Sequence, residues 1–270
     1  MTGSVADRDR LVGELKRTKK YGSVCAEALE RFAERALERY PTRRAALDAA
    51  KRKLHQAFGA YLADGGFGRA AALLAGWPDE LGGDALAVRC EAILRCHAST
   101  AERLPFAREL YRAILARVPA PRVVVDLACG LHPFARPLMG LPAACRVEAV
   151  DLDERLAALL NEFFARTSLP GAARCADLLA PGFRAEADVI LLFKALPSLE
   201  RQETGAVRRL LGRLQAPLLV VSFPTRSLGG RDKGMEATYR AAWLPVFAEL
   251  GFRVEEAVFP AELIFFLQPG

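Results

Sequence analysis

Three polar side chains come directly after short segments that have the composition of buried strands. They are Asp151, Asp177 and Lys194, and the most apolar of the three segments is 188–193. Because the carboxyl ends of parallel strands meet at one edge of an open sheet, where ligands bind, we expect these side chains to share a site. An acidic residue after the second such strand can bond the hydroxyls of a ribose. The pattern therefore predicts a nucleoside-binding crevice.

A turn of small residues follows a further apolar segment, 123–127, and ends at Gly130. Glycine tolerates positive φ and allows a ligand to approach the backbone. Asp151 lies twenty-one residues after Gly130, the separation typical of a ribose-binding acid. Taken alone, the turn fits an ordinary strand–turn–helix equally well. The pattern G-x-G-x-x-G is absent, which leaves less room for the pyrophosphate of NAD or FAD and favours an adenosine ligand without phosphates, S-adenosylmethionine.

These residues need a sheet whose strands alternate with helices. The final two strands, separated at Pro260-Ala261, have the form of an antiparallel hairpin. We therefore predict an α/β fold of the class I S-adenosylmethionine-dependent methyltransferase type, Rossmann-like, with a seven-stranded sheet and an all-helical N-terminal extension. The expected strands are 123–127, 146–150, 172–175, 188–193, 217–222, 252–259 and 262–268, and the expected helices between them are 153–166, 198–213 and 235–250.

The chain before the first strand shows helical periodicity and no convincing strand. Two domains are expected, a basic helical one over 1–98 and a methyltransferase domain over 99–270. Ser99 and Glu102 have the spacing of a capping box at the start of a helix. Arg103 follows, and it can either pair with a nearby acid or clamp the carboxylate of a methionine moiety. Expected helices lie near 5–17, 23–39, 42–62, 69–76, 84–97 and 100–117.

The positive charge is concentrated at the N-terminus. Residues 1–60 hold 14 Lys and Arg against 8 Asp and Glu, whereas residues 61–270 hold 24 of each, so the first part carries the whole net charge of +6. A basic extension on a neutral core favours docking on nucleic acid over a merely solvated, arginine-rich surface. The candidate phosphate contacts there include Lys16, Lys20, Arg52 and Lys53.

Composition excludes several classes of protein. The chain has 270 residues, of which 52% are hydrophobic and 26% charged, so it can bury a sizeable core. No apolar run reaches the roughly 20 residues that span a bilayer, and residues 1–10 lack the apolar segment of a signal peptide. Six cysteines without a C-x-x-C pair indicate reduced thiols in a cytoplasmic protein. Cys90, Cys96 and His97 match no zinc spacing, so we expect no metal.

Four motifs together resemble the aminoglycoside-resistance 16S rRNA methyltransferases, the Arm, Rmt, Sgm and Kgm group. Their residues are His97-Ala98-Ser99-Thr100-x-Glu102-Arg103, Asp126-Leu127-Ala128-Cys129-Gly130-Leu131-x-Pro133, Lys194-x-Leu196-Pro197-x-Leu199-Glu200 and Ser222 to Met235. The last block is long and specific, with three glycines and three cations, and the similarity spans nearly the whole chain. The sequence departs from the family pattern at His132, where Asn is usual, and at Ala195 and Ser198, which replace Thr and Cys.

The resemblance implies methyl transfer from S-adenosylmethionine to N7 of a guanine in the decoding A site (helix 44) of 16S rRNA, within the 30S subunit, which confers aminoglycoside resistance. It implies a cytoplasmic monomer that binds no membrane. Arg103 would hold the methionine carboxylate, Asp151 the ribose and Asp177 the adenine amino group, while Ala128, Gly130, Leu152, Leu178 and Phe193 complete the cofactor site. Lys194, Arg231 and Met235 would surround the target base, and Lys16, Lys20, Arg52, Lys53, Arg201, Arg226 and Lys233 would contact RNA.

The expected chemistry needs no catalytic acid or base. Guanine N7 carries a free lone pair and no proton, so positioning and exclusion of water would supply most of the acceleration. The product base is cationic, so the lysine and arginine side chains would grip phosphates and a flipped base. Met235 can contact that base through its thioether or serve only in packing. The alternatives are a methyltransferase for a neighbouring rRNA adenine or a small molecule, and a non-catalytic ribosome-binding protein.

Overall fold

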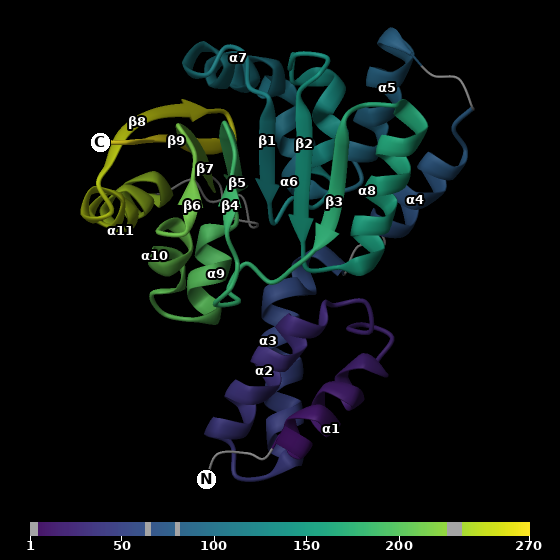
Figure 1. The fold of residues 1–270 in the computed structure, drawn as a ribbon, viewed down its shortest axis with the longest axis vertical. Helices are drawn as coiled ribbons and strands as arrows, with labels where there is room; N and C mark the ends of the chain where they lie inside the picture. The colour runs from purple at the N-terminus through teal and green to yellow at the C-terminus, as the bar shows by residue number, and fades with distance from the viewer. Residues whose placement is uncertain (1–4, 63–65, 79–81, 226–233) are drawn as a thin grey trace.

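The computed structural model describes residues 5–62, 66–78, 82–225 and 234–270, and it is built around a seven-stranded sheet (Figure 1). The strand order is β3-β2-β1-β5-β7-β9-β8, and β9 runs antiparallel to both of its neighbours. The other neighbouring strands are parallel, so the predicted fold class is confirmed. The strands are β1 (Val123–Leu127), β2 (Arg146–Asp151), β3 (Gly171–Cys175), β5 (Val189–Phe193), β7 (Leu218–Pro224), β8 (Phe252–Phe259) and β9 (Glu262–Pro269), with β4 (Ala185–Glu186) paired to β6 (Leu214–Gln215) outside the sheet.

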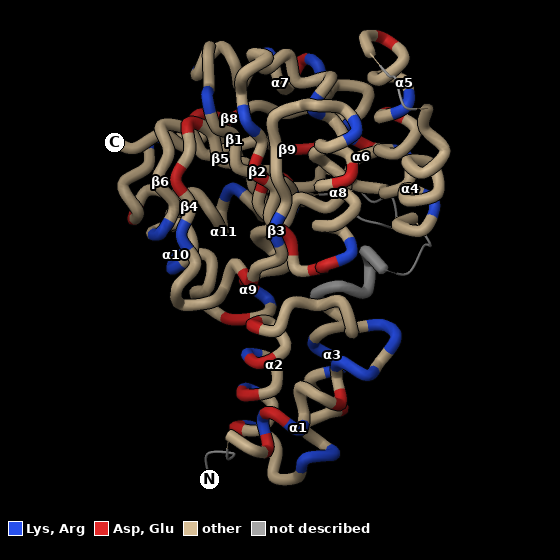
Figure 2. The backbone as a smooth tube through the Cα atoms, turned by 45° about the vertical axis from the view of Figure 1, so that its right-hand side comes forward, with Lys and Arg blue, Asp and Glu red and all other residues tan. Residues whose placement is uncertain are grey.

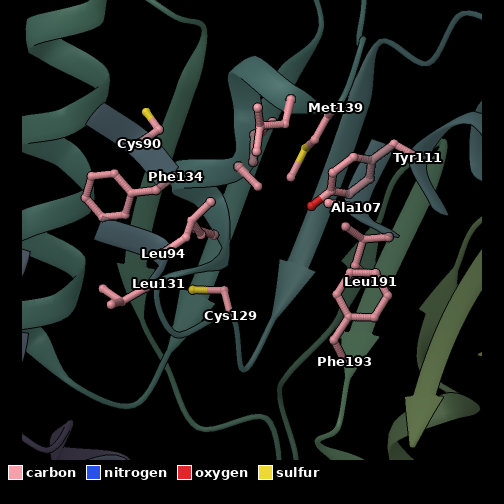
Figure 3. Packing of buried hydrophobic residues seen from close by; sticks show 14 of the residues in the cluster. Cys90, Leu94, Ala107, Tyr111, Cys129, Leu131, Phe134, Met139, Leu191 and Phe193 are labelled. Carbon is pink, nitrogen blue, oxygen red and sulfur yellow. The ribbon is translucent and has the colours of Figure 1, made fainter. Parts of the chain in front are cut away.

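Helices cover both faces of the sheet because the central strands are apolar on both. In β5, Val189 and Leu191 join one buried cluster, and Ile190 and Leu192 join another. Figure 3 shows part of the first cluster, in which helical side chains such as Tyr111 lie near β5. The first cluster includes residues of α5 (Gly83–Leu94), α7 (Ala107–Arg117), η2 (His132–Leu138) and α8 (Glu154–Thr167), and the second includes residues of α9 (Leu196–Gln202), α10 (Ala206–Leu211) and α11 (Met235–Glu249).

The first three helices form a lobe of their own beyond the carboxyl ends of β1, β2 and β3 (Figure 1). They pack around a separate apolar cluster that includes Leu11, Leu29 and Leu54. By contrast, the next two helices contribute Leu74 and Ile93 to the core beside the sheet. The domain boundary at residue 98 stays a prediction. The lobe comprises α1 (Val5–Lys16), α2 (Ala26–Arg39) and α3 (Arg43–Leu62), and α4 (Gly66–Ala75) precedes α5.

One predicted helix start is wrong. The helix α6 (Ala98–Arg103) begins one residue before Ser99, with His97 in extended conformation at its N-cap and no side-chain cap. The hydroxyl of Thr100 donates to the carbonyl oxygens of Leu94 and His97. With these bonds the N-cap lies at His97, two residues earlier than the Ser99 that the capping-box spacing predicts. The predicted helix 100–117 is also divided, because a 3-10 turn (Leu104–Phe106) separates α6 from α7.

The predicted helix 198–213 is two helices, α9 and α10. Between them Gly205 adopts a left-handed φ of 75°, which reverses the chain at low steric cost. The carboxylate of Glu200 accepts hydrogen bonds from the backbone amides of Gly205 and Val207, the latter at 3.1 Å. A side chain of the first helix therefore satisfies the free amides at the start of the second.

A glycine at the start of β3 has a packing role that a stability measurement can test. A Cβ added at Gly171 would lie 2.3 Å from Cε1 of Phe164, whose ring is buried. We expect Gly171→Ala to lower the free energy of unfolding by about 1–3 kcal/mol in urea denaturation, because the core would be overpacked. The matched control is Gly182→Ala, where an added Cβ meets nothing within 4 Å. Equal stability of the two variants would contradict this account.

Candidate functional site

A pocket of about 1050 Å³, its open mouth included, lies at the carboxyl ends of β1, β2 and β5. Most of the residues predicted to bind a cofactor line it: Ala128, Gly130, Asp151, Leu152, Asp177, Leu178 and Phe193. Sequence reasoning missed Phe67, His97 and Gln202, which also line the pocket. These three come from segments outside the strand ends, so the strand pattern gave no signal for them. Ala195 and Ser198, two of the departures from the family pattern, lie in the same wall.

The turn after β1 forms the floor of the pocket. Ala128 and Gly130 both adopt left-handed φ values, 51° and 52°, and a Cβ added at Gly130 would meet nothing within 4 Å. A left-handed conformation is uncommon for alanine and costs energy, which is a known feature of functional turns. The amide of Cys129 donates to the carbonyl oxygen of Val150, so the turn is held against β2. The backbone at Gly130 is thus open for close approach by a ligand.

Two backbone amides hold the carboxylate of Asp151, one in the turn after β1 and one in the loop after β2. Its Oδ2 accepts from the amide of Gly130 at 2.9 Å, and its Oδ1 accepts from the amide of Leu152 at 2.7 Å. Burial raises the pKa of Asp151, and the two amide hydrogen bonds partly offset that rise. Each oxygen keeps acceptor capacity. The arrangement fits the pair of hydroxyls on a ribose.

Asp177 makes an ion pair that the sequence did not predict. Its Oδ2 accepts a hydrogen bond from Nε of Arg31 at 2.5 Å, and its Oδ1 accepts one from Nη2 of Arg31 at 3.1 Å. Oδ1 also accepts a hydrogen bond from the amide of Leu179. Arg31 belongs to α2, and its Nη2 lies 3.1 Å from Oε1 of Gln202. The lobe therefore reaches the wall of the pocket.

Arg103 is buried beside the pocket and pairs with an acid, one of the two interpretations that the sequence left open. Its Nη2 lies 2.9 Å from Oε1 of Glu262, and its guanidinium is stacked 4.2 Å from the ring centre of Phe193. Within the described ranges, the buried Nε of Arg103 has no hydrogen-bond partner. Arg103 does not itself line the pocket, whereas Phe193, on which its guanidinium stacks, does.

Of the residues predicted around the target base, Lys194 and Met235 lie within the described ranges. Lys194 follows β5 with a left-handed φ of 57°, and its Nζ lies 2.7 Å from Oε2 of Glu102 and 3.4 Å from Oε1 of Glu262. Met235 is half-buried at the start of α11. The other predicted residues of this segment, Arg231, Arg226 and Lys233, lie outside the described residues.

The departure at His132 is part of a buried hydrogen-bonded chain. Its Nδ1 lies 2.7 Å from Oδ2 of Asp126 and its Nε2 lies 2.8 Å from the hydroxyl of Tyr111. Its ring also packs against that of Phe193 in a T-shaped arrangement, with the ring centroids 4.9 Å apart. These contacts support β1 and Phe193 from behind the pocket, so the histidine is structural.

Three of the predicted RNA contacts come together in one groove. Arg52, Lys53 and Arg201 line it between the lobe and α9, and Gln202 lines both this groove and the pocket. Figure 2 marks the positions of Lys and Arg residues along the backbone of the lobe, together with those of Asp and Glu. Elsewhere on the lobe, Lys16 lines a separate hollow with Arg17 and Lys19, and Nζ of Lys20 lies 2.8 Å from Nδ1 of His55. Arg35 and Arg39 of α2 also line the groove.

Other kinds of site are not found in the described part of the chain. There, no group of three or more His, Cys, Asp or Glu side chains is placed to hold a metal ion. Nor does any described helix have the length and apolar character needed to cross a membrane.

The sheet order and the pocket at its carboxyl edge, called the adenosine pocket below, are those of a class I S-adenosylmethionine-dependent methyltransferase. A family model for ribosomal RNA methyltransferase (FmrO) matches residues 17–266. The chain belongs to this family. A 16S rRNA (guanine(1405)-N(7))-methyltransferase of Frankia casuarinae is 41% identical over 265 residues, which cover 96% of this chain and 93% of that relative.

Further relatives agree. An enzyme with the same name from Micromonospora echinospora is 34% identical, with 99% of each chain covered. The crystal structure of the 16S rRNA methyltransferase RmtF in complex with S-adenosyl-L-homocysteine has a TM-score of 0.83 and 37% identity, covering 99% of this chain and 100% of that one. The structure of the 16S rRNA methylase RmtB has a TM-score of 0.80 at 27% identity, covering 97% and 98%.

The carboxylate of Asp151 gives a direct test of the pocket. We expect Asp151→Ala to weaken the binding of S-adenosylmethionine by about 1–3 kcal/mol, because the ribose hydroxyls would be buried without their carboxylate acceptor. Isothermal calorimetry measures the change. Glu148→Ala, in the same strand but with a half-exposed side chain paired to Arg146, is the control and should bind like the wild type. Unchanged affinity in Asp151→Ala would refute the ribose role.

Proposed function

We propose that the chain transfers a methyl group from S-adenosylmethionine to N7 of a guanine in the decoding A site (helix 44) of 16S rRNA, within the 30S subunit. The modification confers resistance to aminoglycosides. The observation that carries the proposal is the junction of the two cavities: Gln202 lines both the adenosine pocket and the groove that contains Arg52, Lys53 and Arg201. An RNA held in the groove therefore passes the mouth of the pocket.

The residues at the pocket fit the cofactor in a definite orientation. We assign the ribose hydroxyls to Asp151, the adenine amino group to Asp177, and the methionine carboxylate to Arg103, whose Nε has no hydrogen-bond partner within the described ranges. Ala128 and Gly130 allow close approach of the backbone, and Leu152, Leu178 and Phe193 supply apolar contacts. When bound, the cofactor supplies an electrophilic methyl group on a sulfonium.

The protein contributes position and a dry environment to this reaction. Guanine N7 carries an available lone pair and no proton, so no side chain has to remove one. We assign Lys194 and Met235 to holding the base and its phosphates, together with Arg231, which lies outside the described residues. An enzyme that flips the base out of its helix gains the in-line approach that the transfer requires.

We also assign the lobe to RNA docking, as part of a basic N-terminal domain over 1–98. Lys16, Lys20, Arg52, Lys53 and Arg201, with Arg226 and Lys233, contact phosphates. The enzyme acts as a cytoplasmic monomer. In support, the large hydrophobic side chains that are exposed in the described ranges lie on four different elements: Val5 on α1, Leu73 on α4, Val88 on α5 and Val258 on β8.

The product identifies the reaction. Isolated 30S subunits are incubated with the protein and S-adenosylmethionine, and their 16S rRNA is treated with borohydride and aniline. An N7-methylguanine directs strand cleavage, which primer extension locates. We expect one new stop in the decoding A site. A methylated adenine would leave the strand intact, and a non-catalytic binding protein would leave it unmodified, so either outcome refutes N7 transfer.

The groove can be tested through the salt dependence of 30S binding. Replacing both Arg52 and Lys53 by Ala removes two phosphate contacts. We expect the slope of log affinity against log salt to fall by about 0.7–0.9 per contact, with no change in cofactor affinity. Arg146→Ala serves as the control, since this exposed cation lies at the amino end of β2. A slope equal to that of the wild type would exclude the groove from RNA binding.

A further inference from the structure

The segment that leads into α2 is hydrogen-bonded to the loop after β2. The amide of Cys25 donates to the carbonyl oxygen of Leu152 at 2.9 Å, and the amide of Glu154 donates to the carbonyl oxygen of Ser23 at 2.7 Å. Val24 and Asp153 form an antiparallel bridge between these bonds. Leu152 and Asp153 themselves line the adenosine pocket. The beginning of α2 is therefore bound to the loop that presents the ribose acceptor.

Six residues further along the same helix, Arg31 binds the opposite wall of the pocket. Its guanidinium spans both oxygens of Asp177 and also reaches Oε1 of Gln202. The Asp177 side chain is 2% exposed and that of Arg31 is 12% exposed, so water screens this ion pair little. Bidentate pairs of this kind fix orientation as well as distance.

Asp177 can hold Arg31 and a nucleoside at the same time. A carboxylate has about four lone-pair sites. Arg31 occupies one lone-pair site on each oxygen, and the amide of Leu179 occupies a second lone-pair site on Oδ1. One site on Oδ2 stays available for a donor such as an amino group on adenine. Arg31 thus orients the acceptor without replacing the ligand.

The same helix carries part of the basic groove. One turn after Arg31, Arg35 lines the groove, and its Nη1 donates to the backbone oxygen of Gln202 at 3.2 Å. Its Nη2 pairs with Glu203 at 2.5 Å. This helix of 14 residues, roughly 20 Å long, and the segment 23–25 that leads into it therefore together contact two walls of the pocket and one wall of the groove.

We infer that α2 couples cofactor binding to RNA docking, and that Arg31 is the positioning residue through which the coupling passes. The inference rests on the proposed function for the identity of the RNA. A nucleoside bound to Asp151 and Asp177 restrains the two loops to which α2 is bonded. The lobe is then held in the orientation in which its groove adjoins the pocket. By thermodynamic linkage, RNA in the groove must tighten nucleoside binding by the same factor.

The experiment measures 30S affinity with and without saturating S-adenosylhomocysteine, which cannot donate a methyl group. For the wild-type protein we expect the ligand to tighten 30S binding by about fivefold or more, the lower end of typical allosteric coupling. For Arg31→Met, which keeps the length of the side chain but loses the ion pair, the ratio of the two affinities should fall to about one. Its affinity for S-adenosylhomocysteine alone should also be weaker.

A matched control separates coupling from the simple loss of a cation. Arg8 lies in the same lobe, on α1, and pairs with Glu34 away from the pocket. Arg8→Met removes the same charge, so both variants share any general loss of RNA affinity. The ratio of its 30S affinities with and without S-adenosylhomocysteine, however, should equal that of the wild type. If Arg31→Met does not fold, as judged by thermal unfolding, Arg31→Lys keeps the charge without the bidentate geometry and should give an intermediate ratio.

The outcomes distinguish this inference from the proposed function. A wild-type ratio of one, in a protein that produces the decoding-site cleavage, overturns the coupling and leaves the function intact. A wild-type ratio of fivefold that is unchanged in Arg31→Met, or in Arg31→Lys where the first variant does not fold, overturns the role of Arg31. Absence of cleavage by the wild type overturns the proposed function, whereas the binding ratio is measured without any methyl transfer.

Discussion

The carboxyl edge of the parallel sheet has to hold the charged groups that its two apolar faces exclude. The strands β1 and β5 are buried on both sides, so no ionised side chain can be accommodated along their length without a partner. Charge therefore collects where the strands end, at Asp151, Asp177 and Lys194. Each of these has its own compensation, from backbone amides, from Arg31, or from two glutamates. The pocket lies among them.

Glu262 is the most enclosed of these charged groups. It begins β9, has no exposed surface, and contacts both Arg103 and Lys194. A buried carboxylate is costly unless it is paired, and removal of one partner from such a pair commonly destabilises a protein. The antiparallel hairpin thus has a function beyond closing the sheet, because its first residue sets the positions of two cations from α6 and the end of β5. If Arg103 moved away, Glu262 would keep only its longer contact with Lys194, at 3.4 Å.

Local sequence patterns predicted the fold and the location of the pocket, because both follow from short-range periodicity. Continuous apolar runs define β1 and β5, and the topology of a parallel sheet then places Gly130, Asp151 and Asp177 at one edge. The roles of these residues stay predictions. Helix boundaries were less predictable, since the Thr100 hydroxyl and the Glu200 carboxylate impose local bonds that a capping motif does not specify.

Long-range ion pairs could not be predicted at all. Arg31 and Asp177 are separated by 146 residues, and Arg103 and Glu262 by 159. Nothing in either segment's own pattern indicates its partner, because the pairing depends on where the lobe and the hairpin are placed around the finished sheet. From the sequence, Arg103 could pair either with a nearby acidic side chain or with the carboxylate of a ligand. The structure shows the acid, Glu262, paired to Nη2 of Arg103, and the ligand role of Arg103 stays a prediction.

These ion pairs also bear on the role that we propose for Lys194 beside the methyl acceptor. A guanine methylated at N7 becomes positively charged, and unpaired lysine and arginine side chains would oppose that charge. At the end of β5, however, the charges of Arg103 and Lys194 are opposed by those of Glu102 and Glu262, two positive against two negative. The formal charges of these four side chains sum to zero. In the proposed reaction, the neighbouring carboxylates would therefore reduce the repulsion between Lys194 and the cationic product while Lys194 donates hydrogen bonds to RNA.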